Sequence, residues 1–325
     1  MTADPSGANS IAWSDLPAGS HQLRFGDAEV GFDAWIWRGS QPGPTLVLNG
    51  ATHGDEYEGP AVLRCWTDTE PPANLCGTVV LIPVLNEAAF AADLRCHPDD
   101  DGNLARAFPG SPEGSPTARL AHLFDTDVLA HASHYVDLHS GGHALEIHPW
   151  VGFIAGGDAA IDATQRAMAA CFDRLWCWSG PFLPGRTLSA AYERKVAAIY
   201  TESRGAGGLR EEDLVALDNG LQNLLIEIGC LDDTLGPLAP QPCYHSTEAE
   251  ETHLQVHHPA PHAGTFEPTV NLGTTVDVGD TLGTVTAADP GTATPVLAES
   301  AGTVVLRRHQ HAVQTGDALF VVVPI

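Results

Sequence analysis

Residues 44–59 read PTLVLNGATHGDEYEG, and this stretch decides the fold that we expect. Its first part, Pro44 to Asn49, is a continuous apolar run, which is typical of a strand buried in the centre of a sheet. A glycine-containing turn follows, and a helical pattern then runs from about Tyr57 to Trp66. A buried strand that leads through a turn into a helix favours an α/β protein.

The same alternation continues to about residue 226. Further strands are predicted at 21–25, 29–37, 78–84, 135–139 and 197–201, and further helices at 117–132, 158–175 and 211–226. This pattern predicts an α/β fold with a mixed central sheet and helices on both of its faces. Ligands of such sheets bind at the carboxyl ends of the strands, so functional residues are expected there.

The composition changes near residue 232. Residues 232–263 are rich in proline and histidine, and the remaining chain consists of short Thr/Val-rich runs between glycines, without a helical pattern. This indicates hairpins and a small, barrel-like all-β module. We place the larger domain at residues 1–254, with its core at about 43–232, and the all-β module at residues 255–325. We expect the module to wall the mouth of the functional site or to join subunits.

Three candidate metal ligands follow two of the predicted strands. His53 and Glu56 stand three residues apart after the strand 44–49, and His139 ends the strand 135–139. Imidazole and carboxylate groups suit Zn²⁺, and two histidines with one glutamate leave a coordination position open, as in catalytic rather than structural sites. The pattern predicts a catalytic zinc site held by His53, Glu56 and His139.

Neighbouring side chains carry weaker signals. His134, His143 and His148 flank the third ligand, and in a chain with 16 histidines we interpret them as ordinary surface or core residues. Asp137 lies two positions before His139, so both side chains face the same side of the strand. Its carboxylate can orient the imidazole of His139, or it can cap the end of the strand.

Charge excludes several classes of partner. The chain of 325 residues has a net charge of −26, whereas nucleic acids and anionic membrane surfaces require a basic protein surface. Lys195 is the only lysine. An acidic, lysine-poor composition suits a salt-rich cytoplasm, and it also suits a GC-rich genome, so both explanations stay open.

The location is predicted from three features. Residues 1–10 are polar, no run of about 18 apolar residues exists that could span a membrane, and the seven cysteines form no C-x-x-C pair. An odd number of cysteines without paired spacing indicates free thiols in a reducing compartment. We therefore expect a cytoplasmic protein without a membrane span.

Several motifs together resemble the succinylglutamate desuccinylase/aspartoacylase family, relatives of the zinc carboxypeptidases. Residues 49–56 and 137–141 are similar to the family's first and second metal motifs, and residues 83–90 and 95–110 are similar to the sequence between them. The resemblance covers most of residues 43–232. It implies a zinc carboxypeptidase-like fold, one Zn²⁺ per chain and hydrolysis of the amide bond of a small N-acyl amino acid.

The C-terminal module resembles the lipoyl-like β-module of the family's bacterial branch. Residues 260–267 carry this similarity, and the module has no lysine that could hold a lipoyl or biotinyl group. The branch includes a deacetylase of N-acetyl-diaminobutyrate, with which an acidic protein of salt-rich cytoplasm is consistent.

The resemblance also implies roles for two arginines. Arg106 matches the arginine that grips a substrate carboxylate, and Arg95 matches the one that polarises the scissile carbonyl and stabilises the oxyanion. The family usually has Asn immediately before the gripping arginine, but here that residue is Ala105. Asn103 could supply the missing amide, so we include it among the substrate-binding residues.

The general base is expected to be a carboxylate at a strand end beside the metal. Glu202 follows the predicted strand 197–201 and precedes a glycine-rich loop, which fits the family pattern, whereas Glu227 follows the predicted helix 211–226. We assign the base to Glu202 and retain Glu227 as the alternative.

Together these features predict a zinc-dependent deacylase whose partner is a small N-acyl amino acid, with a homo-oligomer allowed. Two other readings stay open. The first is a zinc carboxypeptidase that acts on peptides, which would need an open cleft that the β-module would obstruct. The second is a non-catalytic, metal-binding relative, against which the retention of ligands, arginines and base argues.

Overall fold

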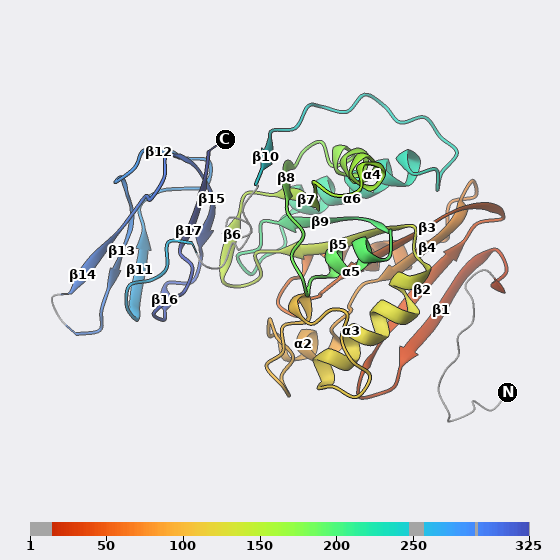
Figure 1. Ribbon diagram of the computed structural model, residues 1–325, viewed down its shortest axis with the longest axis horizontal. Coiled ribbons are helices and arrows are strands. Elements are labelled where there is room, and N and C mark those ends of the chain that lie inside the picture. Colours follow the sequence, from red (N-terminus) through yellow and green to blue (C-terminus); the bar gives the residue numbers. More distant parts are fainter. Residues whose placement is uncertain (1–14, 247–256, 290–291, 325) are drawn as a thin grey trace.

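The computed structural model describes residues 15–246, 257–289 and 292–324. A nine-stranded sheet lies in the larger part of the molecule, and two smaller antiparallel sheets form the C-terminal part (Figure 1). The order of the large sheet is β1-β2-β4-β3-β5-β9-β7-β8-β10. Its strands are β1 (Gly19–Gly26), β2 (Gly31–Arg38), β3 (Gln41–Gly50), β4 (Cys76–Ile82), β5 (His134–Ser140), β7 (Trp150–Ile154), β8 (Trp176–Gly180), β9 (Ala197–Ser203) and β10 (Cys243–His245).

The large sheet is mixed, as predicted. β3 runs parallel to β4 and β5, and β5 runs parallel to β9, so the carboxyl ends of these strands meet at one edge. β1 and β2 form an antiparallel hairpin, and β7 runs antiparallel to β9. The apolar run of β3 is central: Leu46, Val47 and Leu48 have no exposed surface. Burial of both faces of a strand explains why its sequence is continuously apolar.

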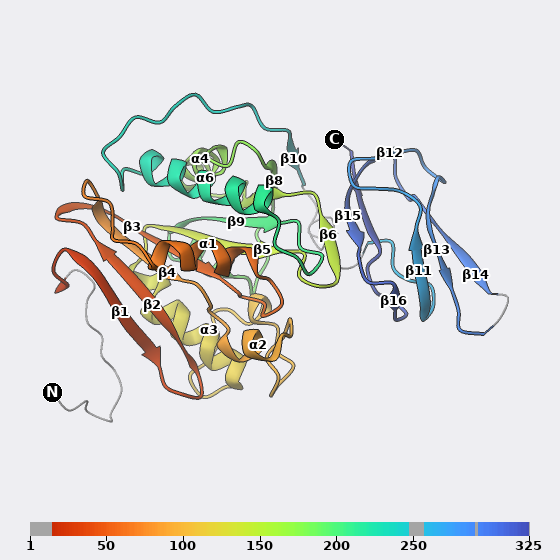
Figure 2. The same ribbon diagram turned by 180° about the vertical axis from the view of Figure 1, so that it is seen from behind.

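Helices cover both faces of the sheet, which confirms the predicted arrangement. α1 (Glu58–Thr67), α4 (Ala159–Ala170) and α6 (Glu211–Glu227) bury their apolar residues against one face. α3 (Pro116–Asp127) packs against the other face (Figure 2), as does α5 (Thr187–Glu193; Figure 1). The short helix α2 (Glu87–Ala92) follows β4. Among the described residues, no helix is both long and apolar enough to cross a membrane.

The C-terminal part contains strands but no helix within its described residues, which matches the all-β prediction. One sheet has the order β14-β13-β11-β16, and the other contains β12, β15 and β17. Phe266 and Phe320 lie in the apolar core between them. The predicted boundary between residues 254 and 255 falls outside the described residues and stays a prediction. The strands are β11 (Gly264–Pro268), β12 (Thr275–Val276), β13 (Thr281–Thr286), β14 (Ala293–Leu297), β15 (Gly302–Arg308), β16 (Ala312–Val313) and β17 (Phe320–Val323).

The strand β6 (Leu145–Ile147) joins the two parts. It follows the predicted ligand region and pairs antiparallel with β15, with Ile147 opposite Leu306. Trp150 and Trp178 of the large sheet share an apolar cluster with Leu306 and other residues of β15 and β17. The all-β module is therefore packed against the larger domain and shares a sheet with it.

Several elements were not predicted. β7 and β8 flank α4, where only a helix at 158–175 was expected, and α5 and β10 were also absent from the prediction. β7 and β8 are five residues long, and α5 is seven residues long. Segments this short carry little periodicity, and they are held by pairing with distant strands rather than by local sequence.

Candidate metal centre

The loop between β3 and α1 carries the first two predicted ligands. It begins at Ala51, whose backbone has a positive φ of 50°, and it turns sharply enough to bring His53 and Glu56 to the same side. Gly54 lies against the backbone of α2: a Cβ atom there would lie 2.1 Å from the carbonyl carbon of Ala89. Only glycine fits at this close approach, so the packing of α2 fixes the path of the loop.

The three predicted ligands come together in the structure. His53, Glu56 and His139 are buried, and their candidate ligand atoms all lie within 4.8 Å of one another. Nδ1 of His53 is 2.7 Å from Oε1 of Glu56, and Nδ1 of His139 is 2.8 Å from Oε2 of Glu56. His139 lies near the end of β5, which is the parallel neighbour of β3. The carboxyl ends of adjacent parallel strands thus supply the cluster, as expected for this class of sheet.

Asp137 orients His139. Its Oδ2 lies 2.9 Å from Nε2 of His139, which leaves Nδ1 directed toward Glu56. The same carboxylate accepts hydrogen bonds from Thr52, Asn49 and Thr187. Burial opposes the charge of Asp137, but His139 and these donors keep its pKa below the usual value. A carboxylate behind a ligating histidine is a recurring arrangement in zinc sites.

The donor set fits a divalent metal ion. His53 has its second ring nitrogen, Nε2, 3.1 Å from Oδ1 of Asn103, so both histidines direct Nδ1 to the centre of the cluster. Burial lowers the pKa of His139, but Asp137 and Glu56 outweigh it and hold that pKa well above its usual range. Negative charge that favours a proton on the imidazole also favours a metal cation in its place. Two imidazole nitrogens and a carboxylate are ligands that Zn²⁺ prefers.

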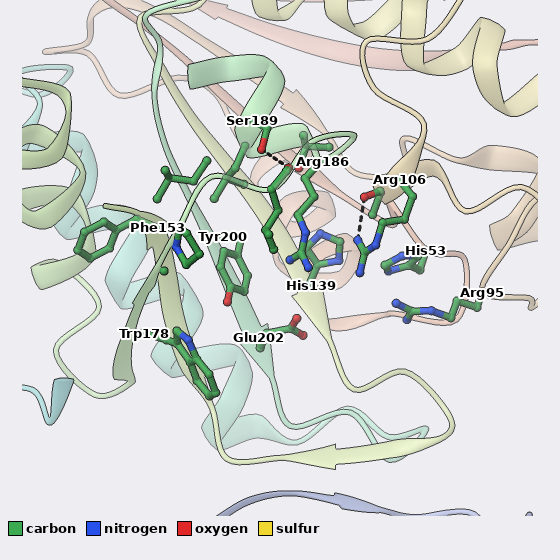
Figure 3. A pocket seen from close by; sticks show the side chains of 17 residues that line it. His53, Arg95, Arg106, His139, Phe153, Trp178, Arg186, Ser189, Tyr200 and Glu202 are labelled. Atoms are coloured by element: carbon green, nitrogen blue, oxygen red, sulfur yellow. Dashed lines mark hydrogen bonds between the residues drawn. The ribbon is translucent and has the colours of Figure 1, made fainter. Parts of the chain in front are cut away.

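A pocket opens beside this cluster. His53 and His139 lie on its wall, and Glu202 projects into it from β9 (Figure 3). Glu202 is paired in register with His139 across the parallel strands β5 and β9. Its Oε2 is buried, and no described residue bonds to this atom. Burial raises the pKa of Glu202 to about 8; Glu56 and Asp137 add to this shift, whereas His139 and Arg95 oppose it.

Both predicted arginines also line the pocket. Nη1 of Arg95 donates to Oε1 of Glu56 over 3.1 Å, and its side chain is 31% exposed. Arg106 belongs to the short 3₁₀ helix η2 (Leu104–Arg106), and Nη1 donates to the carbonyl of Ala105. Burial, together with the neighbouring Arg186 and Arg95, lowers the pKa of Arg106 to about 10.

Arg186 was missed by the sequence reasoning. It lines the same pocket, and no described residue bonds to its buried Nη2. Its loop packs directly on η2, because Phe108 donates its N–H to the carbonyl of Gly185. The only signal in the sequence is an isolated arginine in a loop with prolines and glycine before α5, which does not by itself indicate a site.

The remaining candidates lie elsewhere. Asn103 is not among the residues that line the pocket: its Oδ1 accepts from the backbone N–H of Ala105 and contacts His53. Glu227, the alternative base, is exposed at the end of α6 and does not line the pocket either. Within the described residues, His53, Glu56 and His139 form the one cluster suited to a metal, so His134, His143 and His148 lie outside it.

Comparisons with known proteins show which family the chain resembles over most of its length. The sequence profile of the succinylglutamate desuccinylase/aspartoacylase catalytic domain matches residues 42–228. The chain is 31% identical over 294 residues to the N-alpha-acetyl-L-2,4-diaminobutyric acid deacetylase of Halomonas elongata, covering 87% of this chain and 83% of that protein.

Two solved structures are similar over nearly the whole length. A product-bound ectoine utilization protein from Ruegeria pomeroyi matches with a TM-score of 0.84 and 29% identity, covering 95% of this chain and 97% of the other. A succinylglutamate desuccinylase/aspartoacylase from Rhodobacter sphaeroides matches with a TM-score of 0.83 and 26% identity, covering 95% and 96%. The chain therefore belongs to the succinylglutamate desuccinylase/aspartoacylase family.

Proposed function

We propose that this protein is a zinc-dependent deacylase that hydrolyses the amide bond of a small N-acyl amino acid. The observation that carries the proposal is the buried carboxylate of Glu202, which faces the His53–Glu56–His139 cluster inside a pocket lined by arginines. The names of the relatives, a deacetylase and desuccinylases, support the same reaction class.

His53, Glu56 and His139 would hold one zinc ion per chain. When bound, the ion would act as a Lewis acid that polarises the scissile carbonyl and makes water a stronger acid. Asp137 would keep the imidazole of His139 oriented for this task, because it binds the nitrogen on the far side of the ring.

Glu202 would be the general base. It would accept a proton from the attacking water, and it would later donate that proton to the nitrogen of the leaving amino acid. Arg95 would stabilise the negative charge that develops on the carbonyl oxygen, because its guanidinium lies beside Glu56 and lines the pocket. The raised pKa of Glu202 suits both proton transfers, since a group that titrates near neutrality can accept and return a proton.

Arg106 and Arg186 would bind the α-carboxylate of the substrate. Burial disfavours the charges of both guanidinium groups and lowers both pKa values, and repulsion by Arg186 lowers the pKa of Arg106 further. A carboxylate placed between them would relieve this repulsion and satisfy the Nη2 atom of Arg186. This arrangement also offers a replacement for the amide donor that the family usually has at the position of Ala105; a direct role of Asn103 in substrate binding stays a prediction.

The test is an acetate-release assay of the zinc-loaded protein across N-acetylated amino acids, with blocked and unblocked peptides in parallel. We expect turnover of N-acetyl amino acids and little hydrolysis of peptides. Preferential hydrolysis of peptides would favour the carboxypeptidase alternative, and no turnover of any substrate by protein that holds zinc would favour a non-catalytic relative. The cytoplasmic location stays part of the proposal, and fractionation of the native host would test it.

A further inference from the structure

The pocket has two chemically different ends. At one end lie the metal cluster and Arg106, and at the other lie Trp178 and Tyr200, with Arg186 between them (Figure 3). The apolar residues Ile154, Pro181, Leu183 and Leu188 also line the pocket. Trp178 is 4% exposed, so this wall is part of the packed interior.

The charges of the pocket are unevenly distributed. Three arginines line it, namely Arg95, Arg106 and Arg186, whereas Glu202 is the one carboxylate among the described residues that line it. Glu202 is already required for proton transfer in the proposed mechanism. No acidic side chain is therefore left to pair with a positive charge on a substrate, and any such charge would face at least one guanidinium group.

We propose that the amino acid released by this enzyme has an uncharged, apolar side chain, which occupies the end of the pocket formed by Trp178 and Tyr200. This inference rests on the proposed function. With its carboxylate between Arg106 and Arg186 and its amide at the metal cluster, the substrate would extend its side chain toward Trp178 and Tyr200, which lie beyond Arg186 from the cluster (Figure 3). The relative from Halomonas elongata has a different substrate in this respect, since 2,4-diaminobutyric acid carries a second amino group.

Physical chemistry sets the direction of the preference. Removing an isobutyl or benzyl side chain from water favours its binding by about tenfold to a hundredfold over a hydrogen atom at the same position. An ammonium group would lose hydration at the same place without gaining a carboxylate partner, and it would face the guanidinium group of Arg186, so its binding is disfavoured. N-acetyl-leucine and N-acetyl-phenylalanine should therefore exceed N-acetyl-glycine in kcat/KM by about tenfold or more, and N-acetyl-diaminobutyrate should fall below both.

The experiment compares kcat/KM of the zinc-loaded enzyme for N-acetyl derivatives of leucine, phenylalanine, glycine, aspartate and diaminobutyrate. Higher kcat/KM for the leucine or phenylalanine derivative than for all others supports the inference. A higher value for the diaminobutyrate or aspartate derivative overturns it while leaving the proposed deacylase function intact. Failure to hydrolyse every derivative refutes the proposed function instead, so the two failures are distinguishable.

A matched pair of variants tests the same idea from the side of the protein. Leu183 lies in the loop between β8 and α5 and lines the pocket, so Leu183→Glu places a carboxylate in the pocket wall and Leu183→Gln adds a side chain of similar size without charge. We expect Leu183→Glu to raise the ratio of kcat/KM for the diaminobutyrate derivative over the leucine derivative by tenfold or more relative to Leu183→Gln. An equal ratio in the two folded variants would count against a contact between the substrate side chain and the apolar wall of the pocket.

Discussion

Replacement of Glu202 by glutamine tests the centre of the proposed mechanism. The change removes the ability to accept a proton and alters the shape of the side chain very little. Glu202 lies in β9 beside His139, its Oε2 bonds to no described residue, and it is not one of the three clustered metal ligands. Glu202→Gln should therefore fold and hold about one zinc ion per chain, like the wild-type protein.

The expected loss of activity follows from the role of the base. A positioned general base contributes about 10²- to 10⁴-fold to a rate, which is about 3 to 5 kcal/mol of activation free energy. We expect kcat of Glu202→Gln to fall by this factor at least, because the same carboxylate also returns the proton to the leaving amine.

Stability gives a second readout with a defined sign. The pKa of Glu202 is about 8 in the folded protein against an ordinary value of 4.5, chiefly because the side chain is buried. Between these two pH values the folded state binds the proton more tightly than the unfolded state, so the free energy of unfolding falls as the pH rises from about 4.5 to 8. The difference between the two pKa values of Glu202 lowers the free energy of unfolding by about 5 kcal/mol above pH 8, relative to its value below pH 4.5. Glutamine does not titrate, so the variant should be the more stable protein there.

The assays are steady-state hydrolysis of an N-acetyl amino acid, zinc content, and urea unfolding from pH 5 to 9. Unfolding is measured after treatment with a chelator, since a bound cation would lower the pKa of Glu202. Glu227→Gln is the matched control, because Glu227 is exposed at the end of α6. If Glu202→Gln keeps wild-type turnover while Glu227→Gln is inactive, the base was assigned to the wrong carboxylate.

Four further results are expected. His139→Ala should lose the bound zinc, and full metal occupancy in that variant would contradict the ligand assignment. Asp137→Asn should weaken zinc binding by about 10- to 100-fold in competition with a chelator, whereas unchanged affinity would mean that Asp137 only stabilises the strand end. Leu306→Ala, at a fully buried site of β15, should lower the free energy of unfolding by about 2–5 kcal/mol in urea titrations. The control Val278→Ala, at a site that is 69% exposed, should change this free energy little. Equal effects of the two substitutions would contradict the described packing. With a net charge of −26, the melting temperature should rise between low and high salt, and a flat melting temperature would remove the argument for salt adaptation.

The sequence predicted those parts of the site that depend on local pattern. The apolar run of β3, the turn after it and the start of α1 are consecutive, so strand burial and turn chemistry placed His53 and Glu56 correctly at a strand end. His139 could be added because parallel strands of an α/β sheet present their carboxyl ends at one edge. These inferences needed no knowledge of which distant segments pair.

The parts that were missed depend on pairing over long sequence distances. β7 is held antiparallel to β9 and parallel to β8, and each of these strands is separated from β7 by a helix. Arg186 lines the pocket from a loop that packs against η2 and Phe108, which lie far earlier in the chain. A single arginine and a strand of five residues have no periodic signal, so sequence pattern could not find them.

The C-terminal module meets the larger domain close to the site but contributes no residue, among those described, to the wall of the metal pocket. A neighbouring cavity is lined from the larger domain by Arg95 and from the module by Arg308 and Asp317. The module also covers Trp178, whose ring forms part of the apolar end of the metal pocket. Removing residues 255–325 would expose this tryptophan and strand β6. The truncation would therefore affect the stability of the larger domain and its substrate range at the same time. Single substitutions in β15 separate the two effects, because they weaken the contact while the module stays in place.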